Sequence, residues 1–122
     1  MTIPLLICDD SAMARKQVFR SLPQGWDVAI TYAKNGLEGM EAIREGCGEM
    51  IFLDLTMPEL VGYSVLEAIR QEGHKCMVIV ISADIQPEAL ARVTALGALD
   101  FIKKPINSEK LADVLRKYGL LA

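Results

Sequence analysis

The chain has 122 residues, of which 52% are hydrophobic and 24% charged, a composition typical of one globular domain and not of a disordered segment. Its formal charge of −3 and its isoelectric point near 5.1 give no basic footprint for nucleic acid, and no apolar run approaches the roughly 18 residues of a membrane span. The first residues lack the cationic start and apolar core of a signal peptide, so we expect a cytoplasmic protein.

Short apolar runs of the kind that form strands alternate with helical segments along the whole chain. The runs lie at Leu5–Cys8, Val28–Ala33, Met50–Leu53, Met77–Ile81 and Leu99–Ile102. Apolar residues at helical spacing fill the intervals between them and the segment after the last run. Pro87 is suited to the first turn of one helix, and Asn107 or Ser108 to the cap of the last.

Five strands, each followed by a helix, predict an α/β domain with a parallel sheet covered by helices on both faces. Three of the runs are nearly continuous in apolar residues, as buried strands of such a sheet should be. The run at Val28–Ala33 includes Thr31 and alternates more, which indicates an edge strand. With no repeat or linker along residues 1–122, we expect one domain.

Polar residues follow four of the five predicted strands. Asp9 and Asp10 follow the first, Asp54 the third, Ser82 the fourth and Lys104 the fifth. Ligands of open parallel sheets bind beyond the carboxyl ends of the strands, so these side chains should converge. Three adjacent carboxylates need a compensating charge, which Mg²⁺ supplies, and a carboxylate can be the nucleophile in phosphoryl transfer. Each residue alone would be a turn or cap residue; their joint placement favours a site.

Taken together, these motifs resemble the receiver domains of two-component response regulators, in particular the single-domain CheY-like receivers of chemotaxis. The resemblance covers essentially the whole chain. It rests on Asp9-Asp10, on Asp54-Leu55-Thr56-Met57-Pro58 with Gly62 following, on Ser82-Ala83 and on Lys104-Pro105. The fold that it implies is flavodoxin-like and doubly wound, with five parallel strands in the order 2-1-3-4-5 and five helices.

The resemblance also implies a role for each acidic residue of the site. Asp54 would accept the phosphoryl group, and Asp10 would bind Mg²⁺ directly, with Asp9 acting through a bound water. Thr56 would offer its backbone carbonyl to the metal. A domain of this kind catalyses only its own phosphorylation and slow dephosphorylation, and so acts as a signalling switch and not as an enzyme.

A lysine would contact a phosphoryl oxygen in the same site. Lys104 and Lys103 compete for this role, and Lys104 is preferred because the lysine of the family directly precedes a proline. The bond from Lys104 to Pro105 is of the type that can be cis.

The expected switch consists of Ser82, which would move to bond the phosphoryl group, and Phe101, which would turn inward with it. The alternative interpretation of Phe101 is an ordinary core aromatic residue. Thr56 and Asp84 would border the phosphate and tune its lifetime. The moving surface would comprise the helix at Pro87–Leu96, the last strand and the last helix. A sensor histidine kinase or a phosphotransfer protein would act upstream, and a target protein or an output domain downstream.

Three other functions match part of the pattern. A haloacid-dehalogenase-like phosphatase also uses an aspartate after a strand, but it needs a second acid where this chain has Thr56. A flavodoxin would need a hydroxyl-rich and glycine-rich phosphate loop where Asp9 and Asp10 stand. A pseudo-receiver that only mediates protein contacts would not require the complete set of acids, serine and lysine.

Three cysteines, an odd count without a CxxC motif, favour buried thiols over a redox or metal centre. Cys8 and Cys76 lie in apolar runs, where a thiol is usually a small buried hydrophobic group. His74 lies in a turn between Gly73 and Lys75, so we expect it in solvent.

Overall fold

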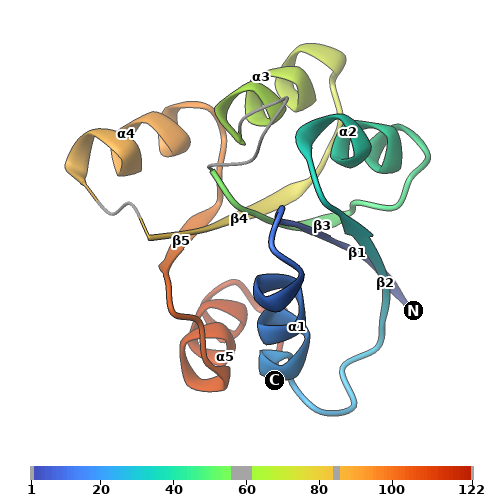
Figure 1. Cartoon of the computed structure of the whole chain (residues 1–122), viewed down its shortest axis with the longest axis vertical. Helices are drawn as coiled ribbons and strands as arrows, with labels where there is room; N and C mark the ends of the chain where they lie inside the picture. The colour runs from blue at the N-terminus through green and yellow to red at the C-terminus, as the bar shows by residue number, and fades with distance from the viewer. Residues whose placement is uncertain (1, 56–61, 84–85, 122) are drawn as a thin grey trace.

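The computed structural model describes residues 2–55, 62–83 and 86–121, and over these residues five strands alternate with five helices (Figure 1). The strands are β1 (Ile3–Cys8), β2 (Val28–Ala33), β3 (Met50–Leu53), β4 (Met77–Ser82) and β5 (Asp100–Lys103). The helices are α1 (Ala12–Ser21), α2 (Gly36–Arg44), α3 (Gly62–Glu72), α4 (Pro87–Ala95) and α5 (Ser108–Lys117). The predicted bounds hold for β2 and β3. By contrast, β1 begins two residues earlier than predicted, β4 continues through Ser82, and β5 is shifted by one residue toward the C-terminus.

The strands form one parallel sheet in the order β2-β1-β3-β4-β5, which confirms the predicted flavodoxin-like topology. Leu6 of β1 pairs with Thr31 on one side and with Ile51 on the other. Among the described strands, β2 therefore has a neighbour only in β1, as the alternating pattern of its residues predicted.

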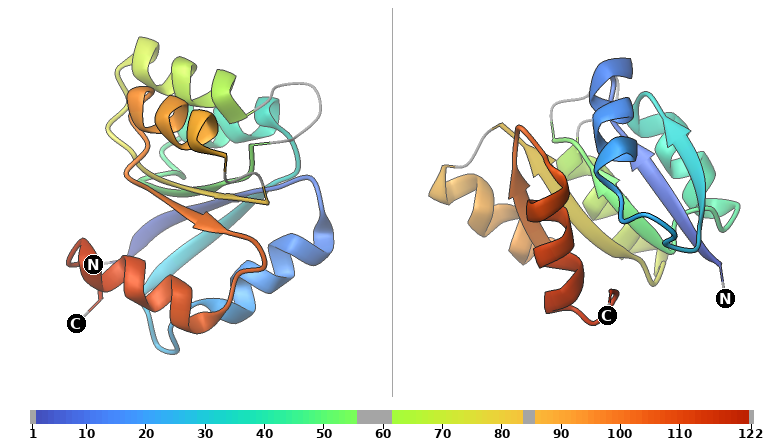
Figure 2. Two further views of the ribbon diagram at one scale, coloured as in Figure 1. Left: turned by 90° about the vertical axis from the view of Figure 1, so that its left-hand side faces the viewer. Right: turned by 90° about the horizontal axis from the view of Figure 1, so that it is seen from below.

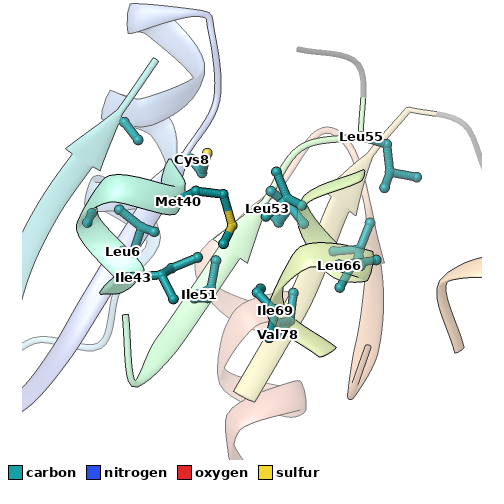
Figure 3. Packing of buried hydrophobic residues seen from close by; sticks show 14 of the residues in the cluster. Leu6, Cys8, Met40, Ile43, Ile51, Leu53, Leu55, Leu66, Ile69 and Val78 are labelled. Atoms are coloured by element: carbon teal, nitrogen blue, oxygen red, sulfur yellow. The ribbon is translucent and has the colours of Figure 1, made fainter. Parts of the chain in front are cut away.

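Helices α2, α3 and α4 cover one face of the sheet, and α1 and α5 cover the other (Figure 1, Figure 2). Successive strand residues point to opposite faces, so neighbours in the sequence enter different cores. Leu6 and Ile51 lie in the core on the α2 and α3 side, together with Ile43 (Figure 3). Leu5 and Phe52 lie in the core on the α1 and α5 side.

The central strands are buried almost completely. Leu5, Leu6, Ile51 and Leu53 have no exposed surface. Full burial of such a side chain contributes about 1.5–3 kcal/mol, so the apolar runs hold β1, β3 and β4 firmly in register. The carboxyl ends of these strands, which carry the predicted site residues, are fixed with them.

The helices begin where the sequence provides a cap. The side chains of Ser11, Asn35 and Asn107 accept hydrogen bonds from the N–H groups of Ala14, Glu38 and Lys110, at 3.2, 2.8 and 2.8 Å. Asn107, and not Ser108, is thus the N-cap of α5. Pro87 opens α4 as predicted. Within the ranges described above, no helix has the length and apolar character needed to cross a membrane.

Candidate functional site

The predicted site residues meet at the carboxyl edge of the sheet. Asp9 directly follows β1, Asp54 directly follows β3, and Lys104 directly follows β5. Ser82 is the last residue of β4 and not the first residue after it, because it still pairs with Lys103 of β5. We call this edge, with Asp9, Asp10, Asp54, Ser82 and Lys104, the rim.

Three carboxylates converge at the rim. Asp9, Asp10 and Asp54 each offer one oxygen, and these oxygens lie within 4.8 Å of one another. Only 4% of Asp9 and 4% of Asp54 is exposed, whereas Asp10 faces solvent. Lys104 lies among them, with its Nζ 2.9 Å from Oδ2 of Asp9 and 3.4 Å from Oδ1 of Asp54.

The electrostatics of the rim are unbalanced toward negative charge. Burial raises the pKa of Asp54, the charge of Asp9 raises it further, and Lys104 offsets this only in part. Burial by itself would lower the pKa of Lys104. Its hydrogen bond to Asp9 and the charge of Asp54 outweigh that effect, and the net shift of the Lys104 pKa is upward. The ammonium of Lys104 therefore pairs with two of the three carboxylates, Asp9 and Asp54, and the cluster can accommodate further positive charge.

The chemistry of the rim matches a hard divalent cation. Carboxylate oxygens are the ligands that Mg²⁺ uses in proteins, usually one or two of them together with waters and phosphate oxygens. The exposed side of Asp10 leaves room for water, and the buried oxygens of Asp9 and Asp54 supply negative charge. The residues present thus fit a magnesium site.

Backbone contacts fix the acidic residues in place. The N–H of Asp9 donates to the carbonyl of Ala33 at 3.0 Å, and the N–H of Asp54 donates to the carbonyl of Cys8 at 2.9 Å. One side-chain oxygen of Asp9, Oδ1, also accepts the N–H of Ser11 at 3.0 Å. The sheet ladder and the turn before α1 therefore hold these carboxylates before any ligand arrives.

The two candidate lysines differ in position. Lys104 reaches both buried carboxylates, whereas Lys103 is an exposed residue at the end of β5. The bond between Lys104 and Pro105 is cis. The geometry therefore favours Lys104 as the cation of the site.

Of the two predicted switch residues, Ser82 belongs to the rim at the end of β4, and Phe101 lies in the neighbouring strand β5. Ser82 is 2% exposed, and its carbonyl accepts the N–H of Lys104 at 2.9 Å. Phe101 is half-buried, pairs with Val80, and packs against the core under α2 and α3. The two remaining predictions, Thr56 and Asp84, lie outside the described residues.

Sequence reasoning did not predict the roles of two residues that shape the rim. Arg15 of α1 donates from Nη1 to the carbonyl oxygen of Asp9 at 2.7 Å. Gly62 opens α3 so close to Asp54 that a Cβ there would lie 2.7 Å from the Asp54 carbonyl oxygen. The bond from Arg15 depends on how α1 leaves the sheet, which the sequence did not indicate. Gly62 is part of the motif that carries the resemblance, but its close approach to Asp54 depends on tertiary packing and was not predicted.

The cysteines behave mainly as predicted. Cys8 is 1% exposed, and burial, followed by the charge of Asp9, raises the pKa of its thiol to about 12. Cys76 is half-buried, and burial raises the pKa of its thiol as well. Thiols with raised pKa values carry little thiolate at neutral pH and react slowly.

Known proteins resemble this chain over nearly its whole length. The family model described as the response regulator receiver domain matches residues 5–116. The chemotaxis protein CheY of Treponema pallidum is 33% identical over 113 residues, which cover 89% of this chain and 77% of that protein. The probable C4-dicarboxylate response regulator DctR of Priestia megaterium is 32% identical over 116 residues, which cover 93% of this chain. The chain spans only 50% of the length of that DctR protein.

A solved structure has the same fold. The response regulator domain of Thermotoga maritima CheB superposes with a TM-score of 0.82 and 28% identity, over 96% of both chains. The chain therefore shares both its fold and its sequence pattern with response regulator receiver domains over nearly its whole length.

Proposed function

The chain belongs to the family of response regulator receiver domains, and on that premise we propose that it is a phosphoryl-accepting switch in which Asp54 is modified with the help of Mg²⁺. Receiver domains of this family serve two-component signalling, in which they receive signals from kinases and act on outputs. The observation that carries the assignment to Asp54 is its burial at the end of β3, with Asp9 and Lys104 in contact range. Residues 1–122 would together form the receiver domain.

In the proposed reaction, an oxygen of the Asp54 carboxylate forms a bond to phosphorus as the bond from phosphorus to a histidine nitrogen of the donor breaks. The donor would be a sensor histidine kinase or a phosphotransfer protein. Lys104 is well placed to neutralise a phosphoryl oxygen because its ammonium already lies 3.4 Å from Asp54. Such reactions depend chiefly on positioning and charge stabilisation, both of which a preformed rim provides.

Asp9, Asp10 and Asp54 would hold Mg²⁺, with the backbone carbonyl of Thr56 as a further ligand. The bound ion would supply positive charge to the carboxylates and to the phosphoryl oxygens. Asp10 would bind it directly and Asp9 through water, which agrees with the hydrogen bonds that already occupy both oxygens of Asp9.

The phosphorylated rim would change the surface made by α4, β5 and α5. A phosphoryl group adds nearly two negative charges and strong acceptor oxygens, which favour a conformer that places donors near it. Ser82 would supply one donor, and Phe101 would turn inward as Ser82 moves. Thr56 and Asp84 would set the lifetime of the phosphate. The altered surface would control a target protein or an output domain in the cytoplasm.

The proposed acceptor is tested by intact mass after incubation with acetyl phosphate and Mg²⁺. Wild-type protein should gain the mass of one phosphoryl group, and Asp54→Asn should gain none. Omitting Mg²⁺ should abolish the gain in the wild type. A wild type that stays unmodified, or an equal gain in Asp54→Asn, would contradict the proposal.

The proposed coupling is tested by hydrogen exchange, which needs no identified partner. Phosphorylation of the wild type should change amide exchange in α4, β5 and α5, and Ser82→Ala should keep the modification but lose most of that change. A coupling of about 1–3 kcal/mol corresponds to a 5–150-fold shift between conformers. An unaltered exchange response in phosphorylated Ser82→Ala would remove Ser82 from the switch.

A further inference from the structure

Arg15 is not one of the five rim residues, but its guanidinium contacts one of them, Asp9. Arg15 lies in α1, is half-buried, and donates to the main-chain oxygen of Asp9 at 2.7 Å. A hydrogen bond from a charged donor is short and roughly twice as strong as a neutral one. The carbonyl that it holds belongs to the peptide unit joining Asp9 to Asp10.

Hydrogen bonds among Asp9, Ser11 and Arg15 form a closed ring in the turn between β1 and α1. The N–H of Arg15 donates to the carbonyl of Ser11 at 3.0 Å, and the Ser11 side chain caps α1 by accepting the N–H of Ala14. Ser11 in turn donates its N–H to Oδ1 of Asp9. Arg15 therefore connects the first turn of the helix to Asp9 through its guanidinium and to Ser11 through its backbone N–H.

Asp9 and Asp10 depend differently on this ring. Asp9 is held at its N–H by Ala33 and at its two side-chain oxygens by Ser11 and Lys104, in addition to its bond from Arg15. In the described part of the chain, no hydrogen bond or ion pair is found on the carboxylate of Asp10. The backbone of the turn therefore sets the direction in which the Cα–Cβ bond of Asp10 points, and no contact among the described residues holds its carboxylate further.

We propose that Arg15 is a positioning residue for the divalent cation: by holding the Asp9 carbonyl, it orients the turn so that the carboxylate of Asp10 joins those of Asp9 and Asp54. This inference rests on the proposed function, because the cation that it concerns is the Mg²⁺ of the phosphorylation site. The positive charge of Arg15 acts in the opposite sense, by repelling a cation. Solvent at the exposed side of the rim screens that repulsion, whereas the loss of orientation is not screened.

The proposal is tested by titrating Mg²⁺ into the unphosphorylated protein in a calorimeter, with Mn²⁺ monitored by electron paramagnetic resonance as a second readout. Arg15→Ala should bind Mg²⁺ about 10-fold more weakly, the usual loss when a residue that supports a metal ligand is removed. Arg15→Lys keeps the charge but not the guanidinium geometry, and its affinity should fall between those of Arg15→Ala and the wild type. Arg20→Ala is the matched control, since Arg20 is an exposed cation in the last turn of α1.

The outcomes separate orientation from charge. If Arg15 acted mainly by repulsion, Arg15→Ala would bind Mg²⁺ more tightly than the wild type, and the proposal would be wrong. Unchanged affinity in Arg15→Ala, or an equal loss in Arg20→Ala, would also overturn it. If Arg15→Ala did not fold by circular dichroism, the comparison of Arg15→Lys with wild type would decide. A wild type that binds no Mg²⁺ would instead contradict the proposed function itself.

Discussion

Two clusters of charged side chains lie at opposite ends of the sheet, and they differ in almost every physical respect. At the rim, Asp9 and Asp54 are buried and share Lys104. At the other end, Glu72 accepts hydrogen bonds from Arg44 at 3.0 and 2.7 Å and is 3.0 Å from the imidazole of His74. The side chains of that second cluster are 25–53% exposed.

The two clusters shift the pKa of their central carboxyl groups in opposite directions. Burial and the charge of Asp9 raise the pKa of Asp54. Hydrogen bonds from Arg44 and then from His74 lower the pKa of Glu72 to about 2. In the far cluster, made of Arg44, Glu72 and His74, the charge of Glu72 is paired, and the ion pair connects the ends of α2 and α3. The rim has unbalanced negative charge, which agrees with the proposed binding of a cation.

Removing the cation of the rim should have the largest effect. Lys104→Met would leave the transferred phosphoryl group without its ammonium, so labelling by acetyl phosphate at fixed Mg²⁺ should slow about 100-fold, as when one preorganised donor is lost from other active sites. Lys103→Met, which removes the exposed neighbouring lysine, should label at nearly the wild-type rate. Intact mass followed over time gives both rates. Equal rates in the two variants would show that the position of the ammonium is unimportant.

Two glycines lie at the ends of α3, Gly62 near the rim and Gly73 near the far cluster, and their substitution compares the two regions at the level of the backbone. A Cβ at Gly62, near the rim, would lie 2.7 Å from backbone atoms of Asp54 and Leu55, so Gly62→Ala should destabilise the fold by about 1–3 kcal/mol. A Cβ at Gly73, at the far end, would have no atom of the described residues within 4 Å, but Gly73 has a φ of 76°. Gly73→Ala should therefore cost about 1 kcal/mol through backbone strain alone.

Urea unfolding measures the loss in the free energy of unfolding for both variants. The rate of labelling at Asp54 is a second property in which the two variants should differ. Gly62→Ala should slow phosphorylation because it displaces the backbone of the acceptor, whereas Gly73→Ala should not. Loss of labelling in Gly73→Ala would mean that the far end of α3 communicates with the rim.

Neutralising Asp54, the proposed acceptor, should stabilise the protein in the absence of metal. The folded-state pKa of Asp54 is raised, so its contribution to stability is full below the unfolded-state pKa and is lost as the pH rises through the folded-state value. In buffer with a chelator, Asp54→Asn should unfold at a higher urea concentration than the wild type at neutral pH, and the difference should vanish on acidification. Mg²⁺ should reduce it by stabilising the wild type.

Asp113→Asn serves as the control, because the Asp113 side chain on α5 is 70% exposed. It should have little effect on unfolding at any pH. A wild type as stable as Asp54→Asn at neutral pH without metal would argue against unbalanced negative charge at the rim.

Most of the fold was predictable because parallel strands buried on both faces require nearly continuous apolar runs. Those runs located all five strands to within two residues, and the topology that the resemblance implied is confirmed. The convergence of Asp9, Asp54 and Lys104 was equally accessible, because residues that follow parallel strands meet at one edge. Ser82 was placed just after β4 but lies inside it, since its pairing with Lys103 depends on a strand far along the chain.

Features set by tertiary contacts were not predictable. Asp9 and Asp10 are chemically identical neighbours, yet only the packing of the turn buries one and exposes the other. The bond from Arg15 to Asp9 likewise requires knowing how α1 leaves the sheet. His74 was expected in solvent, and this was wrong in part: it is half-buried and bonded to Glu72 at the end of α3. A turn sequence indicates the bend but not the partner.

The smallest effect is expected at the far cluster. The folded-state pKa of Glu72 is lowered, so its ion pairs stabilise the fold above the ordinary carboxyl pKa and lose this effect as the pH falls toward about 2. Because the pairs are exposed, Glu72→Gln should lower the melting temperature by no more than about 3 °C at neutral pH and low salt, and less at high salt. The difference in melting temperature between Glu72→Gln and the wild type should shrink on acidification, because Glu72 then becomes protonated in the wild type. Labelling of Asp54 should be unchanged. Glu67→Gln, on the exposed side of the same helix, is the control. A loss of stability in Glu72→Gln as large as that in Gly62→Ala would contradict the expectation that the far cluster contributes little to stability.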